Sequence, residues 1–261
     1  MTVAKALQLT DSLKILVNDF ALRSLRETAD KDYVHARLAY RSRLIPQALW
    51  SSLHCLEKYM KCILVLNQID AKKIKHEFEL GLTELNSQGK FQIELSEPAK
   101  AFVTKLEDGA RFRYYETSYH AEELDLLKLD KTVWELRRYC QPLDYDFEIN
   151  GRQENQLAAN LGRIRAAQQA GEKGTCIANG WLESILDKPN HSAREALIWK
   201  NLFFGRSHRQ KVSIQNYHES GNSPLFMHPE IVDEVAKYIF LPEEVKVAYR
   251  QLATQRLAGH Q

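Results

Sequence analysis

The chain has 261 residues, of which 44% are hydrophobic and 27% charged, and its formal net charge is +2. This length allows one large or two smaller domains with a sizeable core. The balanced charge excludes a chain-wide positive field, so any binding to nucleic acid has to come from local patches. The four cysteines form no CxxC pair, which indicates a reduced, cytoplasmic protein without a structural zinc site.

No targeting or membrane segment is expected. Residues 1–14 lack the long apolar core and the small-residue cleavage site of a secretory signal. The longest apolar run of the central segment, 62–66, is far too short to span a membrane. The motifs GxGxxG, GxxxxGK[ST] and GxSxG are absent, and no cofactor is expected.

Hydrophobic periodicity predicts helices throughout the first half of the chain. Apolar residues recur at helical spacing over 11–27 and 32–42, with an interruption at 29–30. The clearest pattern covers 46–67, where Pro46 suits the first turn of a helix. Its broad apolar face is typical of a central bundle helix that contacts partners on several sides. The residues that define this face, at steps of four and three, are Leu49, Leu53, Leu56, Met60 and Ile63.

Helical spacing continues over 77–85, 97–109, 110–120 and 122–141. The stretch 141–151 then combines proline, clustered acids and an Asn-Gly dipeptide. Because these residues favour turns, this stretch is the best candidate for a domain boundary.

Beyond this stretch the pattern predicts further helices over 152–170, 177–186 and 193–204, whereas 211–214 resembles a short strand. The terminal helices are expected to begin at Pro229 and Pro242.

Together these patterns predict an all-α protein. We expect an up-and-down helical bundle with a smaller, mainly helical C-terminal appendage. The predicted parts are an N-terminal helix within 1–29 that packs on the bundle, the bundle itself at 30–141, and a helical C-terminal domain at 151–261 to which the sequence assigns no role.

The stretch 110–120 (ARFRYYETSYH) carries the most informative polar residues. On a helix, Glu116 would precede His120 by four residues and lie near enough to orient its imidazole. Arg113, two turns from His120, would aim its guanidinium at the same anionic ligand. This pair suits a phosphodiester, because the arginine neutralises charge while the histidine moves a proton. In the alternative interpretation, the aromatic residues of this helix are core and the polar residues form a solvated face.

Two basic stretches are candidates for contacts with RNA. The first is the run of Lys72, Lys73 and Lys75, and Arg111 adds a further cation. The second comprises Arg206, Arg209 and Lys211, near aromatic side chains that suit a single strand: Trp199, Phe203, Phe204 and Tyr217. The alternatives are a solvated loop for the first stretch and core positions for the aromatic residues of the second. The histidines are scattered without metal-binding spacing, so no metal site is expected.

Several motifs of the bundle segment follow one another in a defined order: Ala36-Arg37, Tyr40, Glu57-Lys58, Met60-Lys61 and Lys75-His76. In this order they resemble the HEPN domain superfamily, over residues 30–141. The resemblance implies a HEPN-like bundle and a homodimer. It also implies that an arginine and a histidine, with four to six residues between them near the start of a late helix, would cut RNA without a metal. Arg113 and His120 match this motif at its longest spacing, with Tyr114 where the family often has a polar residue.

The resemblance further implies a mechanism and a setting. His120 would take a proton from the ribose 2′-hydroxyl or return one to the leaving oxygen, while Arg113 stabilises the phosphate and Glu116 orients the imidazole. The expected function is a metal-independent endoribonuclease or RNA-binding factor of a toxin–antitoxin or defence system, with a nucleotidyltransferase-type antitoxin as partner. The alternative is a non-catalytic helical module that binds a nucleotide or another protein.

Overall fold

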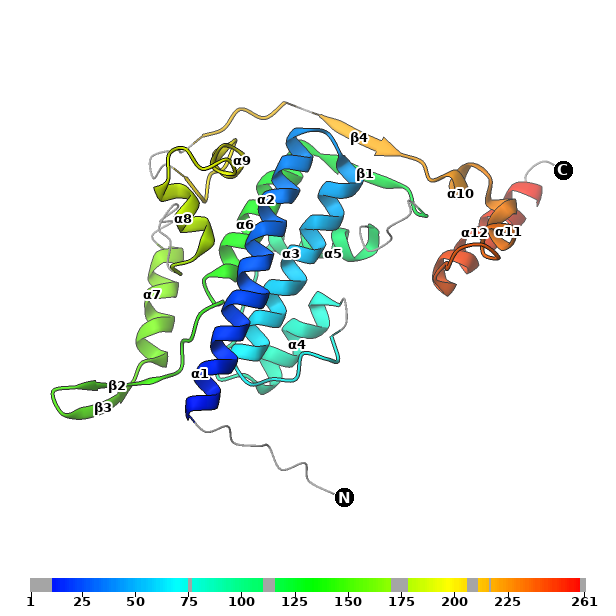
Figure 1. Cartoon of the computed structure of the whole chain (residues 1–261). Helices are drawn as coiled ribbons and strands as arrows, with labels where there is room; N and C mark the ends of the chain where they lie inside the picture. Colours follow the sequence, from blue (N-terminus) through cyan, green and yellow to red (C-terminus); the bar gives the residue numbers. More distant parts are fainter. Residues whose placement is uncertain are drawn as a thin grey trace, which may run out of the picture.

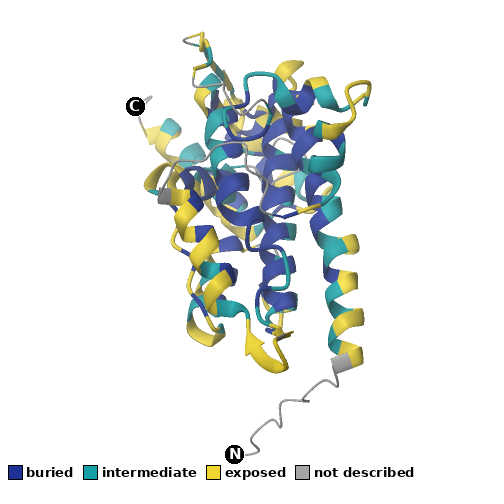
Figure 2. Ribbon diagram, turned by 90° about the vertical axis from the view of Figure 1, so that its left-hand side faces the viewer, coloured by how far each residue is buried: buried dark blue, intermediate teal, exposed yellow. Residues whose placement is uncertain are grey.

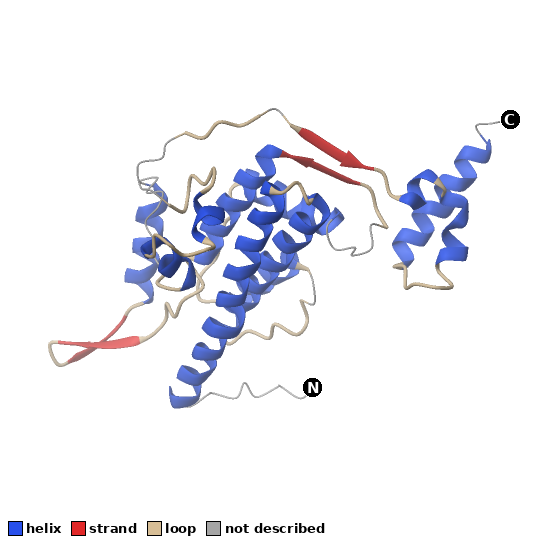
Figure 3. Ribbon diagram, turned by 45° about the horizontal axis from the view of Figure 1, so that its top comes forward, coloured by secondary structure: helices blue, strands red, loops and turns tan. Residues whose placement is uncertain are grey.

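The computed structural model describes residues 11–74, 77–109, 116–169, 178–205, 211–215 and 217–258. Within these residues the protein is mostly helical, with two separate two-stranded antiparallel sheets (Figure 1 and Figure 3). This composition is compatible with the predicted all-α class. None of the described helices combines the length and the apolar character needed to cross a bilayer.

The chain begins with one long helical rod made of α1 (Asp11–Phe20), a π-helical segment (Ala21–Arg26) and α2 (Glu27–Arg41). The interruption predicted at 29–30 is wrong. Asp30 is fully buried within α2, where it accepts hydrogen bonds from Arg137 (2.7 and 2.9 Å) and from the Tyr59 hydroxyl (2.6 Å). Because these partners occupy the carboxylate, it does not compete for backbone donors, and the helix continues.

The central helix α3 spans Ile45–Leu66, within one residue of its predicted bounds at each end. Its apolar face is buried as predicted, and α3 contacts α2, the π-helical segment and three later helices. These are α4 (Phe78–Gln88), α5 (Glu97–Gly109) and α6 (Glu123–Arg137). Figure 2 shows the buried residues concentrated in the interior of the helical bundle. The sequence therefore predicts the central helix correctly, both in its bounds and in the face that it buries.

A two-stranded ribbon interrupts the helices between α5 and α6. Its strands are β1 (Tyr119–Glu122) and β4 (His218–Gly221), which pair antiparallel with Glu122 opposite His218. The helix predicted to continue through 120 is therefore wrong at its C-terminal end, and residues 110–115 lie outside the described residues. The strand predicted at 211–214 is also wrong, since the strand of this region is β4. Side chains alternate across β1, so Ala121 is buried while His120, on the opposite face, is exposed.

A β-hairpin begins in the stretch predicted as a boundary and continues into the helix predicted over 152–170, which is therefore wrong at its N-terminal end. Strands β2 (Asp146–Ile149) and β3 (Arg152–Asn155) pair through a turn at Asn150-Gly151. Both turn residues have positive φ angles, +51° and +77°, as the type I′ turns that favour Asn-Gly require.

The main hydrophobic cluster continues beyond this hairpin. It includes residues of α7 (Leu157–Gln169), α8 (Trp181–Asp187) and α9 (Arg194–Ile198). The helix predicted over 193–204 is shorter than expected, because α9 ends at Ile198. Phe203 and Phe204 are nevertheless buried in the main cluster, which agrees with the core interpretation of these two residues.

The C-terminal residues form a small helical unit at the far end of the β1–β4 ribbon (Figure 1). It contains α10 (Pro224–Met227), a 3-10 turn (Pro229–Ile231), α11 (Val232–Val235) and α12 (Glu243–Ala258). Its second, smaller hydrophobic cluster is built from Leu225, Val232, Leu241, Val245 and Tyr249. Pro229 and Pro242 lie at or immediately before helical starts, as expected.

Candidate functional site

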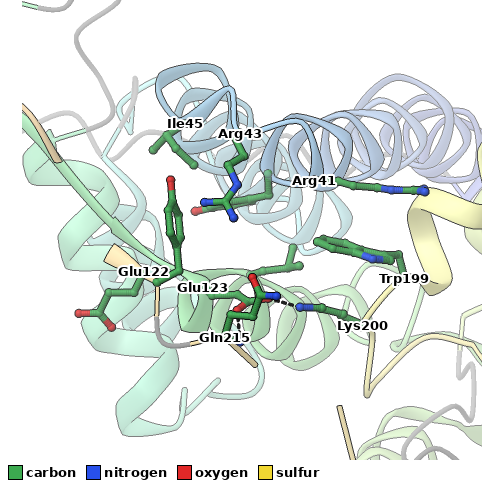
Figure 4. A pocket seen from close by; sticks show the side chains of 11 residues that line it. Arg41, Arg43, Ile45, Glu122, Glu123, Trp199, Lys200 and Gln215 are labelled. Atoms are coloured by element: carbon green, nitrogen blue, oxygen red, sulfur yellow. Dashed lines mark hydrogen bonds and ion pairs between the residues drawn. The ribbon is translucent and has the colours of Figure 1, made fainter. Parts of the chain in front are cut away.

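A pocket of about 200 Å³ lies where the chain turns from α2 into α3 (Figure 4). Four segments that are far apart in the sequence line it: the α2–α3 turn, the start of α6, the residues that follow α9 and the residues that precede β4. Cationic and aromatic side chains from different segments meet there.

Arg43 occupies the turn at one side of the pocket. The backbone N–H groups of Arg43 and Leu44 donate to the carbonyls of Tyr40 (3.1 Å) and Ala39 (2.9 Å), the two bonds of a Schellman motif. The residue at the position of Arg43 in this motif is usually glycine, because φ is positive, and Arg43 has φ +58°. The turn therefore carries a large charged side chain at a position where most L-residues are disfavoured.

The guanidinium of Arg43 stacks on an aromatic ring. Its central carbon lies 3.8 Å from the centre of the Tyr217 ring. Of the three cations that line the pocket, Arg41 pairs with Glu195 at 2.6 Å and Lys200 pairs with Glu123. Arg43 has no carboxylate partner within the part of the chain that the structure describes.

Trp199 and Lys200 form the facing wall. The ammonium of Lys200 lies 5.3 Å from the centre of the Trp199 ring. Lys200 also has a positive φ angle, +50°, so two of the four non-glycine residues with positive φ in the described ranges line this pocket. Backbone strain of this kind clusters at functional sites.

A buried ion pair holds this wall in place. Arg37 of α2 is fully buried and pairs with Asp130 of α6. The same guanidinium donates to the backbone carbonyl of Ala196 (2.9 Å) and to that of Trp199. The Tyr33 hydroxyl donates to Asp130 as well (2.6 Å). One carbonyl within α9 and one in the turn that follows it are thereby tied to the bundle core.

The start of α6 organises the last wall. Glu123 pairs with Lys200 and accepts a hydrogen bond from the backbone N–H of Gln215, while its own backbone N–H donates to the carbonyl of Tyr217 (3.3 Å). Figure 4 shows the carboxylate of Glu122 turned away from Arg43. The acids of the pocket are therefore neutralised or directed elsewhere.

The three predicted catalytic residues are not brought together by a helix. Arg113 lies outside the described residues. Glu116 is buried in the loop before β1, where its backbone carbonyl accepts hydrogen bonds from the hydroxyls of Ser223 (2.9 Å) and Tyr249 (2.6 Å). The predicted helical relation of Glu116 to His120 is wrong, because His120 lies on a strand. The carboxylate beside His120 is that of Glu122, with Oε1 3.4 Å from Nε2.

The predicted RNA-binding residues fall into separate regions. Lys72 and Lys73 are exposed in the loop that follows α3, at the opposite end of this helix from Arg43. At the usual rise per residue, the 22 residues of α3 separate its two ends by about 33 Å. Lys211 is exposed and lines a second hollow of about 460 Å³, which shares Trp199 and Lys200 with the pocket. Outside the described residues lie Lys75, Arg111, Arg206 and Arg209.

The sequence predicted part of this pocket and missed its principal cation. Trp199 and Tyr217 belong to the aromatic group considered for single-strand binding, and both line the pocket. Arg43 was not predicted, although it lies between two predicted helices in a turn that has no glycine. That absence is the one local signal that a non-glycine residue would take a positive φ there.

Comparisons with protein families, with curated proteins and with solved structures find no match to this chain. The geometry of the pocket is therefore the basis for the function proposed below.

Proposed function

We propose that this protein binds single-stranded RNA and holds one nucleotide in the pocket between the α2–α3 turn and Tyr217. The observation that carries the proposal is the Arg43 guanidinium, which stacks on Tyr217 at 3.8 Å without a carboxylate partner among the described residues. A guanidinium in this position offers a planar, permanently charged donor to a phosphate. The aromatic ring beside it offers a stacking surface for a base.

The size and composition of the pocket support one nucleotide rather than a larger ligand. Its volume of about 200 Å³ is below the range of about 300–1,000 Å³ that is usual for small-molecule sites. Trp199 provides a second aromatic surface on the facing wall, next to Lys200, whose charge is paired with Glu123. Stacking on aromatic side chains accepts any base, so this arrangement suits binding with little sequence preference.

The hollow lined by Lys211 supports an extended strand. Because it shares Trp199 and Lys200 with the pocket, a chain that leaves the pocket passes the exposed ammonium of Lys211. Contacts between cations and phosphates make binding weaken as salt concentration rises. The proposal therefore includes a dependence of RNA affinity on salt.

Fluorescence anisotropy of a labelled single-stranded RNA of mixed sequence tests the proposal. Replacing Arg43 with alanine removes the guanidinium that would donate to a phosphate and that stacks on Tyr217, and we expect the affinity for RNA to fall about 10-fold or more. Replacing Tyr217 with leucine removes a stacking surface worth about 1–3 kcal/mol per base. The matched control is Arg256→Ala, since the Arg256 guanidinium also lies over an aromatic ring, that of Phe226 at 5.2 Å, but in the C-terminal unit. Equal affinities for the parent, Arg43→Ala and Arg256→Ala proteins would refute the proposal.

A further inference from the structure

Two histidines and a carboxylate gather on one face of the β1–β4 ribbon. His120 and Glu122 are two residues apart on β1 and so share a face, and Glu122 lies opposite His218 on β4. The other face carries Tyr119 and Ala121, and Ala121 is buried against the core. The ribbon is thus anchored by one face and presents His120, Glu122 and His218 on the other.

The distances between these side chains are close to those of metal ligands. Nε2 of His120 lies 3.4 Å from Oε1 of Glu122, and one donor atom from each of the three residues lies within 4.8 Å of the others. Two ligand atoms bound at about 2.1 Å to a tetrahedral ion lie about 3.4 Å apart. The two imidazole rings are nearly parallel, with centres 5.7 Å apart and planes at 19°. Both histidines are exposed, so their imidazoles have room to rotate toward a shared ion.

The carboxylate of this group is already held in position. Glu122 caps α6 through a capping box, in which its side chain accepts from the backbone N–H of Asp125 and the Asp125 side chain accepts from the backbone N–H of Glu122 (2.8 Å). The ammonium of Lys128 lies 3.8 Å from Oε2 of Glu122, on the oxygen that does not face His120. Hydrogen bonds to a ligating carboxylate restrict its orientation and strengthen metal sites.

We propose that His120, Glu122 and His218 bind one divalent transition-metal ion. Two imidazoles and a carboxylate form a donor set that suits Zn²⁺ and its neighbours in the first transition row, rather than Mg²⁺ or Ca²⁺. Three protein ligands leave at least one position for water or an added ligand. The ion would join two strands that are distant in the sequence and so stabilise the ribbon. The proposal is independent of RNA binding, because Glu122, which lines the pocket, turns its carboxylate away from Arg43, and neither histidine is among the lining residues.

Isothermal titration of the metal-free, full-length protein with Zn²⁺ tests the site. We expect one tight site in the parent, and a loss of affinity of at least about 10-fold in His120→Ala and in His218→Ala. Glu122→Gln keeps an oxygen for the helix cap but removes the negative charge, and we expect it to weaken binding as well.

The matched control is His228→Ala. His228 is also exposed beside a carboxylate, with Nδ1 3.3 Å from Oε1 of Glu230, but no second histidine is grouped with this pair in the described residues. We expect this variant to bind Zn²⁺ as the parent does. Far-UV circular dichroism of each variant verifies that it is folded. The proposal is overturned if the folded His120→Ala and His218→Ala proteins bind Zn²⁺ as tightly as His228→Ala, or if the parent shows no tight site.

Discussion

Replacing Arg37 with methionine tests how the pocket wall is held. The side chains of Arg37 and Asp130 are both fully buried, and the guanidinium also donates to the carbonyls of Ala196 and Trp199. The variant would leave the Asp130 carboxylate buried without its counter-charge and would remove a donor from both carbonyls. Removing one partner of a buried ion pair costs about 3–5 kcal/mol. We expect the free energy of unfolding to fall by that amount, which is a large share of the roughly 5–15 kcal/mol typical of folded proteins.

Urea unfolding followed by far-UV circular dichroism measures this loss. The matched control is Arg41→Met, because Arg41 lies on the same helix and also pairs with an acid, Glu195 at 2.6 Å, but at the surface. Exposed pairs contribute about 0–1 kcal/mol, so the control should barely change stability. Equal losses in Arg37→Met and Arg41→Met would refute the reasoning, since burial would then have no effect.

A double variant separates the lost charge pair from general disruption of packing. Asp130→Asn keeps an oxygen that accepts from the Tyr33 hydroxyl (2.6 Å in the parent) while it removes the charge. In the Arg37→Met/Asp130→Asn protein no unpaired charge remains, so we expect it to be more stable than the sum of the two single losses predicts. If the loss of the double variant agrees with the sum of the two single losses within about 0.5 kcal/mol, the two residues act independently and the proposed coupling is contradicted.

Three further predictions concern packing, buried charge and catalysis. Gly81→Ala would place a Cβ 2.5 Å from Cγ of the buried Met60 and should lower the free energy of unfolding by about 1–2 kcal/mol. The control Gly162→Ala meets no neighbouring atom within 4 Å of the new Cβ, so it should be neutral or stabilising in the same urea assay. Burial lowers the pKa of Arg138 to about 10, below the value of 12.5 for a free arginine, so its charge destabilises the folded state below pH 10. Arg138→Met should therefore raise the free energy of unfolding by about 1 kcal/mol at pH 7, and this gain should shrink as the pH rises above 10. A loss of stability at pH 7 would contradict a destabilising charge on Arg138. The predicted ribonuclease would cleave mixed RNA in the presence of chelator, leave 2′,3′-cyclic ends and lose this activity in His120→Ala; equal cleavage by the variant would exclude His120 as the base.

Local patterns in the sequence predicted the helical framework. The apolar steps of 46–67 placed α3 within one residue of its ends, because burial of one helix face requires that spacing wherever the helix lies. The Asn-Gly dipeptide at 150–151 likewise indicated a turn, since both residues tolerate a positive φ. Trp199 and Tyr217 were recognisable as candidate stacking surfaces for a base, because they are aromatic and lie near cationic residues in the sequence.

The candidate site itself depends on contacts between distant segments. His120 was expected on a helix, and pairing of β1 with β4 places it on a strand instead. Asp30 was expected to interrupt a helix, and its buried partner Arg137 allows the helix to continue. Strand pairing and buried ion pairs gain their free energy from a partner far along the chain, so no local spacing predicts them. The sequence alone thus determined the helices that pack around α3. The tertiary structure decided which side chains meet, because Arg43 acquires its stacking partner, and His120 its neighbouring carboxylate and imidazole, only when distant segments pack together.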